Sequence, residues 1–259
     1  MNLYEAMFVR KSVRDYSMEA LDDKTLEHIK SYLTQLKPYK TSIAYEIKIV
    51  DAQKDGSKLK GMFHVKAPYY ILFSSELKTD YLINAGYILH QLCLYLTARN
   101  IGCCYQGGIH PTHELKDELT HDYVIALAFG KSPKSIYRPA NKARRLDEDS
   151  LIVYKEEVDE NVKNILHAAV LSPSSMNNQP WRFVVYHNRI HLFCKKARFL
   201  TSVLSDSKLI DMGVVLASMA QAADELWMDA TLVKAEAFQN KQLKNTEYIT
   251  TFMLKDKVF

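Results

Sequence analysis

The chain has 259 residues, of which 47% are hydrophobic and 25% are charged, and its formal net charge is +4. These values indicate a globular protein of one large or two small domains, and the scattered basic residues do not indicate a nucleic-acid-binding protein. With no apolar run that could span a bilayer, no secretory signal at the start and no C-x-x-C spacing among four cysteines, we expect a cytoplasmic protein without a membrane segment.

A basic segment follows the first predicted helix, which covers residues 3–8. In an extended segment, Arg10, Ser12 and Arg14 lie on one face and Lys11 lies on the other. Two guanidinium groups beside a hydroxyl suit a phosphate, because the planar arginine head donates parallel hydrogen bonds. The alternative is a basic edge facing solvent, and the segment by itself slightly favours that alternative.

Alternation and apolar runs predict the remaining elements of the first half. The expected elements are a helix capped by Asp22 or Asp23 and reaching about Leu36, strands at 45–50 and 69–73, a long apolar helix at 81–100, a short helix after Thr112 and a strand at 123–129. Gln106 precedes Gly107 and Gly108, which either let the backbone approach a ligand or form a turn. Residues 130–132 resemble the end of a nucleotide-binding loop, but Ile125 stands where that loop requires glycine.

A second basic cluster, Asn141-Lys142-Ala143-Arg144-Arg145, precedes an acidic stretch. Together with the first cluster, it could enclose one phosphorylated ligand. Alternatively, both clusters face solvent.

The most polar loop is Ser172-Pro173-Ser174-Ser175-Met176-Asn177-Asn178-Gln179-Pro180-Trp181. Its amides and hydroxyls could read the edge of a heteroaromatic ring, although such residues more often form ordinary turns. The elements predicted around it are a helix from Asp159 to about Leu171, a hairpin at 181–186 and 189–194, a long apolar helix at 208–227, and strands at 232–238 and 248–254.

The order of elements repeats along the chain. Leu82-Ile83-Asn84-Ala85-Gly86 matches Leu209-Ile210-Asp211-Met212-Gly213, and the strands around these two segments correspond. We therefore predict an α+β fold made of two divergent copies, residues 1–150 and 151–259, each with a mainly antiparallel sheet and helices. The polar loop occurs only in the second copy, because residues 37–40 of the first copy are Lys-Pro-Tyr-Lys, and the basic clusters occur only in the first.

Four segments resemble the FMN-dependent nitroreductase family. Residues 10–14 with Tyr16 resemble its N-terminal signature, residues 173–181 resemble its P-S-x-x-N-x-Q-P-W loop, and residues 142–144 resemble its K-x-R element. Residues 106–108 fall where the family has a glycine-containing segment beside the flavin, which is a looser match. Because each part occurs once, the chain is similar to a two-copy, single-chain branch of the family known from a thermophile nitroreductase.

The resemblance implies a fused pseudo-dimer, expected to be monomeric, with one complete site and about one FMN per chain. It places Arg10, Ser12, Lys142 and Arg144 at the phosphate and ribityl chain, with Lys11 also among the cofactor-binding residues. It places Arg14 at the flavin N1 and C2 carbonyl edge. It also implies that the ring is bordered by Gln106, Gly107, Gly108, Pro173, Ser174, Ser175, Asn177 and Gln179. Trp181 is expected to be structural.

The implied reaction passes a hydride from NAD(P)H through FMN to a small nitroaromatic or quinone-like acceptor, with the cofactor carrying the chemistry and no catalytic side chain required. One alternative is a non-catalytic flavin-binding or sensor protein, and another is a flavin-independent protein on the same scaffold. The spacing of His110, His113 and His121 does not match a zinc site, so we expect no metal.

Overall fold

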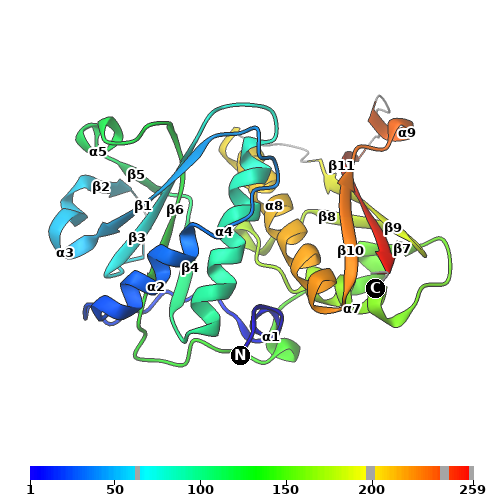
Figure 1. Cartoon of the computed structure of the whole chain (residues 1–259), viewed down its shortest axis with the longest axis horizontal. Helices are drawn as coiled ribbons and strands as arrows, with labels where there is room; N and C mark the ends of the chain where they lie inside the picture. The colour runs from blue at the N-terminus through cyan, green and yellow to red at the C-terminus, as the bar shows by residue number, and fades with distance from the viewer. Residues whose placement is uncertain (62–64, 197–201, 240–244, 257–259) are drawn as a thin grey trace.

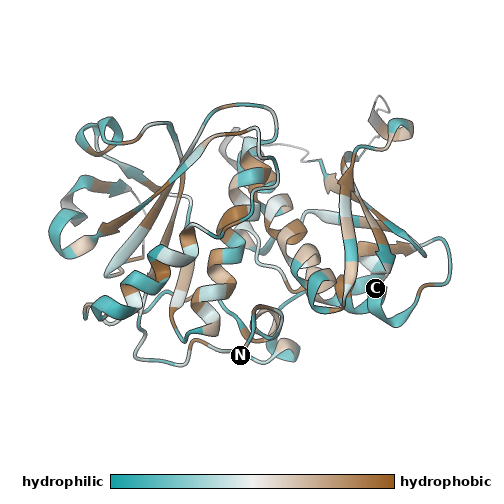
Figure 2. Cartoon of the chain, in the orientation of Figure 1, coloured by the Kyte–Doolittle hydropathy of each residue, from teal (hydrophilic) through white to brown (hydrophobic). Residues whose placement is uncertain are grey.

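The computed structural model describes residues 1–61, 65–196, 202–239 and 245–256. Two sheets lie on opposite sides of a central pair of long helices, α4 (Tyr81–Ala98) and α8 (Ser202–Glu225), as Figure 1 shows. Both helices are apolar around most of their circumference, which is typical of helices buried in a core (Figure 2).

The first sheet has the strand order β1 (Tyr45–Asp51), β3 (Tyr69–Ser75), β6 (Asp122–Gly130) and β4 (Gly102–Gln106), and all pairs are antiparallel. Helix α2 (Asp23–Leu33) begins at the predicted cap, Asp22, and ends three residues before the expected Leu36. The smaller elements here are α1 (Leu3–Val9), α3 (Ala52–Asp55), η1 (Gly56–Lys58), β2 (Leu59–Gly61), β5 (Ile109–Pro111) and α5 (His113–Asp117).

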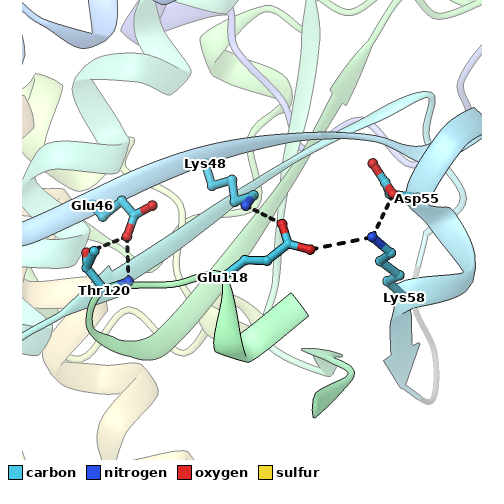
Figure 3. Close-up of polar contacts among 6 residues, drawn as sticks. All are labelled: Glu46, Lys48, Asp55, Lys58, Glu118 and Thr120. Carbon is cyan, nitrogen blue, oxygen red and sulfur yellow. Dashed lines mark hydrogen bonds and ion pairs between the residues drawn. The ribbon is translucent and has the colours of Figure 1, made fainter. Parts of the chain in front are cut away.

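A polar network joins the edge strand β1 to the turn after α5 (Figure 3). Glu118 pairs with Lys48 at 2.6 Å and with Lys58 at 3.5 Å. The carboxylate of Glu46 accepts hydrogen bonds from the backbone and hydroxyl of Thr120. These exposed contacts fasten the turn after α5 to β1, and exposed ion pairs of this kind contribute little to stability.

The second sheet has the order β7 (Ile152–Tyr154), β8 (Trp181–Tyr186), β9 (Arg189–Lys195), β11 (Thr246–Asp256) and β10 (Met228–Val233). Only β7 pairs in parallel, with β8. Helix α7 (Glu160–Val170) begins at the predicted cap, Asp159. The smaller elements here are η2 (Ala140–Lys142), α6 (Glu148–Leu151), η3 (Ser175–Asn177) and α9 (Glu236–Gln239).

The predicted strand at 232–238 is wrong. The strand is β10, which starts directly after Trp227, and residues 236–239 form α9 instead. Strand β10 lies at the edge of its sheet, and most of its residues are exposed. Apolar patterning therefore does not mark it, because an edge strand with little burial needs no hydrophobic face.

The two sheets confirm the predicted repeat. When β1, β3, β6 and β4 are matched with β8, β9, β11 and β10, the spatial order is the same, and both sheets contain an irregularity in the matched pair β3–β6 and β9–β11. The fold is therefore α+β, with two divergent copies fused as a pseudo-dimer. The boundary between residues 150 and 151 stays a prediction.

Helices α4 and α8 cross at matched glycines. A Cβ atom on Gly86 would overlap the carbonyl oxygen of Ile210, and one on Gly213 would overlap that of Ile83. These pairs exchange under the repeat, so the crossing has the self-complementary form of a twofold interface.

A segment of the first half also packs on the second half. Helix α1, at the start of the first half, buries Ala6 and Met7 in the core that contains β8 and β9 of the second half. Trp181, expected to be structural, is fully buried in the same core. Within the described residues, no helix combines the length and apolar character needed to cross a membrane.

Candidate functional site

A pocket opens between the two halves. Its first wall comes from the N-terminal segment, β4 and β6, and its second wall comes from the polar loop and α8. The cavity between the walls measures about 180 Å³ and is open to solvent. Six of the residues predicted to bind the cofactor line it: Ser12, Arg14, Gly107, Pro173, Ser174 and Ser175.

The N-terminal segment is extended where it reaches the pocket. The backbone N–H of Val13 donates to the carbonyl of Cys103 at 3.0 Å, and Ser12 forms a parallel bridge with the same strand, β4. Val13 is buried, whereas Ser12 and Arg14 face the pocket. The predicted alternation is therefore confirmed, and Arg10 is linked to it by a hydrogen bond to Ser12 Oγ at 3.4 Å.

The polar loop has a strained backbone. Met176, Asn177 and Gln179 have φ angles of +50°, +57° and +46°. These angles fall in the left-handed region that residues other than glycine rarely occupy. Such strain persists only where other contacts fix the conformation. Here the N–H of Gln179 donates to Ser174 Oγ at 2.9 Å, and the Gln179 side chain donates to the carbonyl of Asn177 at 3.2 Å.

Two buried contacts fasten this loop to α8. The N–H of Ser175 donates to both carboxylate oxygens of Asp211, at 2.9 and 3.1 Å. Ser172 shares a hydrogen bond with Ser218 at 2.8 Å, and Ser218 continues to His90 Nε2 on α4 at 3.0 Å. Burial and the nearby charge of Arg10 lower the pKa of His90 to about 3. The hydrogen-bonded series Ser172–Ser218–His90 is therefore neutral, and it positions the loop without adding charge.

Beyond the loop lies a cluster of three arginines, Arg10, Arg138 and Arg145. Arg10 is only 6% exposed, the other two are partly buried, and the buried Nε of each arginine has no hydrogen-bond partner. Within the described residues, none of them forms an ion pair. Burial, followed by repulsion from Arg10 and Arg138, lowers the pKa of Arg145 to about 10.

Arg145 joins this cluster to the polar loop. It donates to Asn177 Oδ1 at 3.1 Å and to the carbonyl of Leu171 at 2.8 Å. All of its hydrogen-bond partners are neutral, so the three positive charges are uncompensated in an environment of reduced polarity. An arrangement of this kind is suited to an anion with several oxygens.

The remaining predicted residues lie elsewhere. Lys11 is partly buried outside the lining, Gly108 is exposed beside the lining residue Gly107, and Lys142 and Arg144 are exposed. Gln106 is buried and bonds with Val65 and Tyr105.

Asn177 and Gln179 hold the basic segment against the loop. The Asn177 side chain donates to the carbonyl of Arg144 at 3.1 Å, and Gln179 Oε1 accepts from the N–H of Leu146 at 2.9 Å. These two amides therefore join the polar loop to the second basic segment and do not line the pocket.

Arg138 and Asp211 were missed from the sequence, and Arg145 was named only as a member of the second basic cluster. Arg145 follows Arg144 directly, and one position of offset decides which side chain turns inward. Arg138 has no local signal, and it is brought in by the bridge between its neighbour Tyr137 and Arg10. Asp211 was marked only by its match with Asn84 in the repeat.

Comparison with known proteins agrees with this architecture. The model of a family described as "Putative TM nitroreductase" matches residues 2–223. A putative nitroreductase from Thermotoga maritima has the same fold over 98% of this chain and 93% of its own, with a TM-score of 0.67 and 19% identity. A search of curated proteins finds no match.

Shorter nitroreductases align with only part of the chain. A nitroreductase with bound FMN from Desulfitobacterium hafniense DCB-2 covers 58% of this chain and 97% of its own, with a TM-score of 0.43 and 17% identity. An FMN-dependent nitroreductase from Clostridium difficile R20291 covers 56% and 95%, with a TM-score of 0.44 and 17% identity. From the family match over most of its length, we conclude that this chain belongs to the putative TM nitroreductase family, a family of oxidoreductases.

Proposed function

We propose that the chain binds one FMN in the pocket between its halves and passes a hydride from NAD(P)H to a small quinone-like or nitroaromatic acceptor. The observation that carries this proposal is the uncompensated cluster of Arg10, Arg138 and Arg145 beside the pocket. Arg10 is linked to the lining residue Ser12, and Arg145 is linked to Asn177 of the polar loop.

The arginine cluster fits the phosphate of FMN. Each of the three side chains has a buried Nε–H without a partner, and a phosphate dianion offers several acceptors to such donors. Its charge would also offset the repulsion that lowers the pKa of Arg145. We assign Arg145 the phosphate-binding role predicted for Arg144, and Lys142 and Arg144 would attract the anion from the solvent side.

The pocket itself fits the flavin ring. Arg14 lies on one wall, where its cation would stabilise the negative charge that develops at N1 and the C2 carbonyl. Pro173, Ser174 and Ser175 form the opposite wall, held in place by the contacts with α8. When bound, the flavin supplies the hydride chemistry, and the chain's residues hold it and stabilise charge.

The test is the flavin content and turnover of the purified chain. We expect about one FMN per chain and oxidation of NAD(P)H when a quinone is added. Two flavins per chain would contradict the single-site reading. A flavin-loaded chain that never oxidises NAD(P)H would show a non-catalytic flavin carrier, and failure to bind FMN on reconstitution would refute the whole proposal.

We also propose that the chain acts as a monomer in the cytoplasm. Both walls of the pocket come from one chain, so no second copy is needed to complete it. Light scattering of the flavin-loaded protein should give a mass near 29.8 kDa, and a stable dimer would contradict this part of the proposal.

A further inference from the structure

The pocket contains a buried carboxyl group that the proposed chemistry has not used. Asp211 lies on α8, is 5% exposed and forms part of the pocket lining. Its hydrogen-bond contact is the backbone N–H of Ser175. A buried acid at the wall of a reaction pocket requires a reason, because burial penalises its charged form.

The internal repeat shows that loop attachment alone does not require an acid. The residue matched with Asp211 is Asn84 on α4, and its Oδ1 accepts from the backbone N–H of Lys40 at 3.0 Å. Lys40 follows Pro38 by two residues, as Ser175 follows Pro173, so the two contacts correspond. An amide oxygen thus fastens the first loop as a carboxylate oxygen fastens the second. The acid occurs on α8, which contributes residues to the pocket lining, and the amide occurs on α4, which is not among the lining elements.

The surroundings of Asp211 favour its protonated form. Burial raises its pKa to about 8, and this outweighs the opposing effects of the Ser175 N–H and of Lys208. The titratable and charged groups that share the pocket or its wall with Asp211 are Lys208 on α8, Cys194 on β9, Arg14 on the N-terminal segment, and Cys104 and Tyr105 on β4. At neutral pH the group is therefore largely a carboxylic acid, able to release a proton.

We propose that Asp211 is a catalytic residue that donates the proton required when a quinone-like acceptor is reduced in the pocket. This inference rests on the proposed function. The acceptor receives two electrons and one hydrogen as a hydride, supplied in turn by NAD(P)H, and the second hydrogen as a proton from the carboxyl oxygen of Asp211. The products are a hydroquinone and the Asp211 carboxylate, which regains a proton from water through the open mouth.

The decisive variant is Asp211→Asn, which introduces the residue present in the matched position. The loop contact is preserved, since an amide oxygen accepts the same N–H at Asn84. We expect reoxidation of the reduced holoenzyme by benzoquinone to slow by about 100-fold, a typical effect of removing a general acid. Reoxidation by ferricyanide should change by less than about 3-fold, because ferricyanide takes an electron without a proton.

The pH dependence of the rate is a second test, because a purely structural role of Asp211 would not alter it. For the wild type, the rate with benzoquinone should fall as the pH rises through about 8, because Asp211 then loses its proton. This fall should be absent in Asp211→Asn. Wild-type rate and pH dependence in the variant, or equal slowing with both oxidants, would overturn the proposal.

Two further measurements separate this inference from the proposed function. Reduction of the bound flavin by NAD(P)H in the wild type tests the proposed function, because this step takes no proton from Asp211. If the wild type itself is not reduced, the proposed function fails, whatever Asp211 does.

Stability tests the titration without any flavin. The folded-state pKa of Asp211 is raised, so its contribution to stability is complete below pH about 4 and is lost as the pH rises to about 8. Urea unfolding of the flavin-free wild type should show this loss across the window, and Asp211→Asn should show a smaller one. Equal slopes in both proteins would contradict a buried, titrating Asp211.

Discussion

The loops at residues 37–40 and 172–175 occupy equivalent places in the two copies. The first loop packs Tyr39 against the core, whereas the second loop lines the pocket with Ser174. Each loop is fastened through a backbone N–H to the same position of a long helix, Asn84 or Asp211. The residue before that N–H is Tyr39 in the first copy and Ser174 in the second.

Tyr39 fills part of the gap beside the first loop. Its ring packs 6.1 Å from that of Tyr87, adds to the core of the second half and lies beside Thr250 on β11. Its neighbour Lys40 forms an ion pair with Asp80. Ser174, in contrast, is small enough to leave space between the halves. The comparison indicates that side-chain volume at one loop position decides how much of the gap between the copies is filled.

The helix crossing is the feature that both copies share most closely, and changes there should have the largest effect. We expect Gly86→Ala and Gly213→Ala each to lower the free energy of unfolding by about 3 kcal/mol, because the added methyl meets backbone of the facing helix. Urea denaturation measures this. Gly107→Ala is the control, since its added Cβ would meet nothing within 4 Å among the described residues beyond its two chain neighbours. If only one of the two substitutions were destabilising, the two glycines would not be equivalent, which would contradict a twofold crossing.

The arginine cluster beside the pocket belongs to the first copy only. Within its segment, the partly buried Arg145 should contribute more to FMN binding than the exposed Arg144. We expect Arg145→Ala to weaken FMN binding by about 30-fold, because a buried charge-assisted contact is lost. Arg144→Ala is the matched control, with less than about a 3-fold change, since that side chain is exposed. Flavin fluorescence titration measures both affinities. A larger effect at Arg144 would show that Arg144, and not Arg145, binds the phosphate.

The filled gap in the first copy gives the smallest expected effect. Tyr39→Ser, which introduces the residue of the second loop, should cost about 2 kcal/mol through lost packing of a partly buried ring. It should not add a second flavin, because the basic clusters belong to the first copy alone. Thermal unfolding and flavin content measure the two results. A second bound flavin would show that Tyr39 alone had closed the site.

Local patterns were sufficient where one residue's role depends on its immediate neighbours. Alternation placed Ser12 and Arg14 on one face of an extended segment, and the caps Asp22 and Asp159 started their helices as expected. The repeat was readable because the matched glycines at 86 and 213 occupy the same place in similar segments. Strand β10 was misplaced, because an exposed edge strand carries no periodic signal.

The sequence by itself determined the two-copy organisation, the family resemblance and the two motifs that form opposite walls of the pocket. Only the tertiary structure decided that Arg138 and Arg145 lie close enough to Arg10 for its charge to lower their pKa. It also decided that Asn177 and Gln179 join the polar loop to the second basic segment, and that Asp211 is buried at the pocket. These properties depend on contacts between residues far apart in the chain. Side-chain direction in irregular segments follows from such contacts, and no local periodicity encodes it.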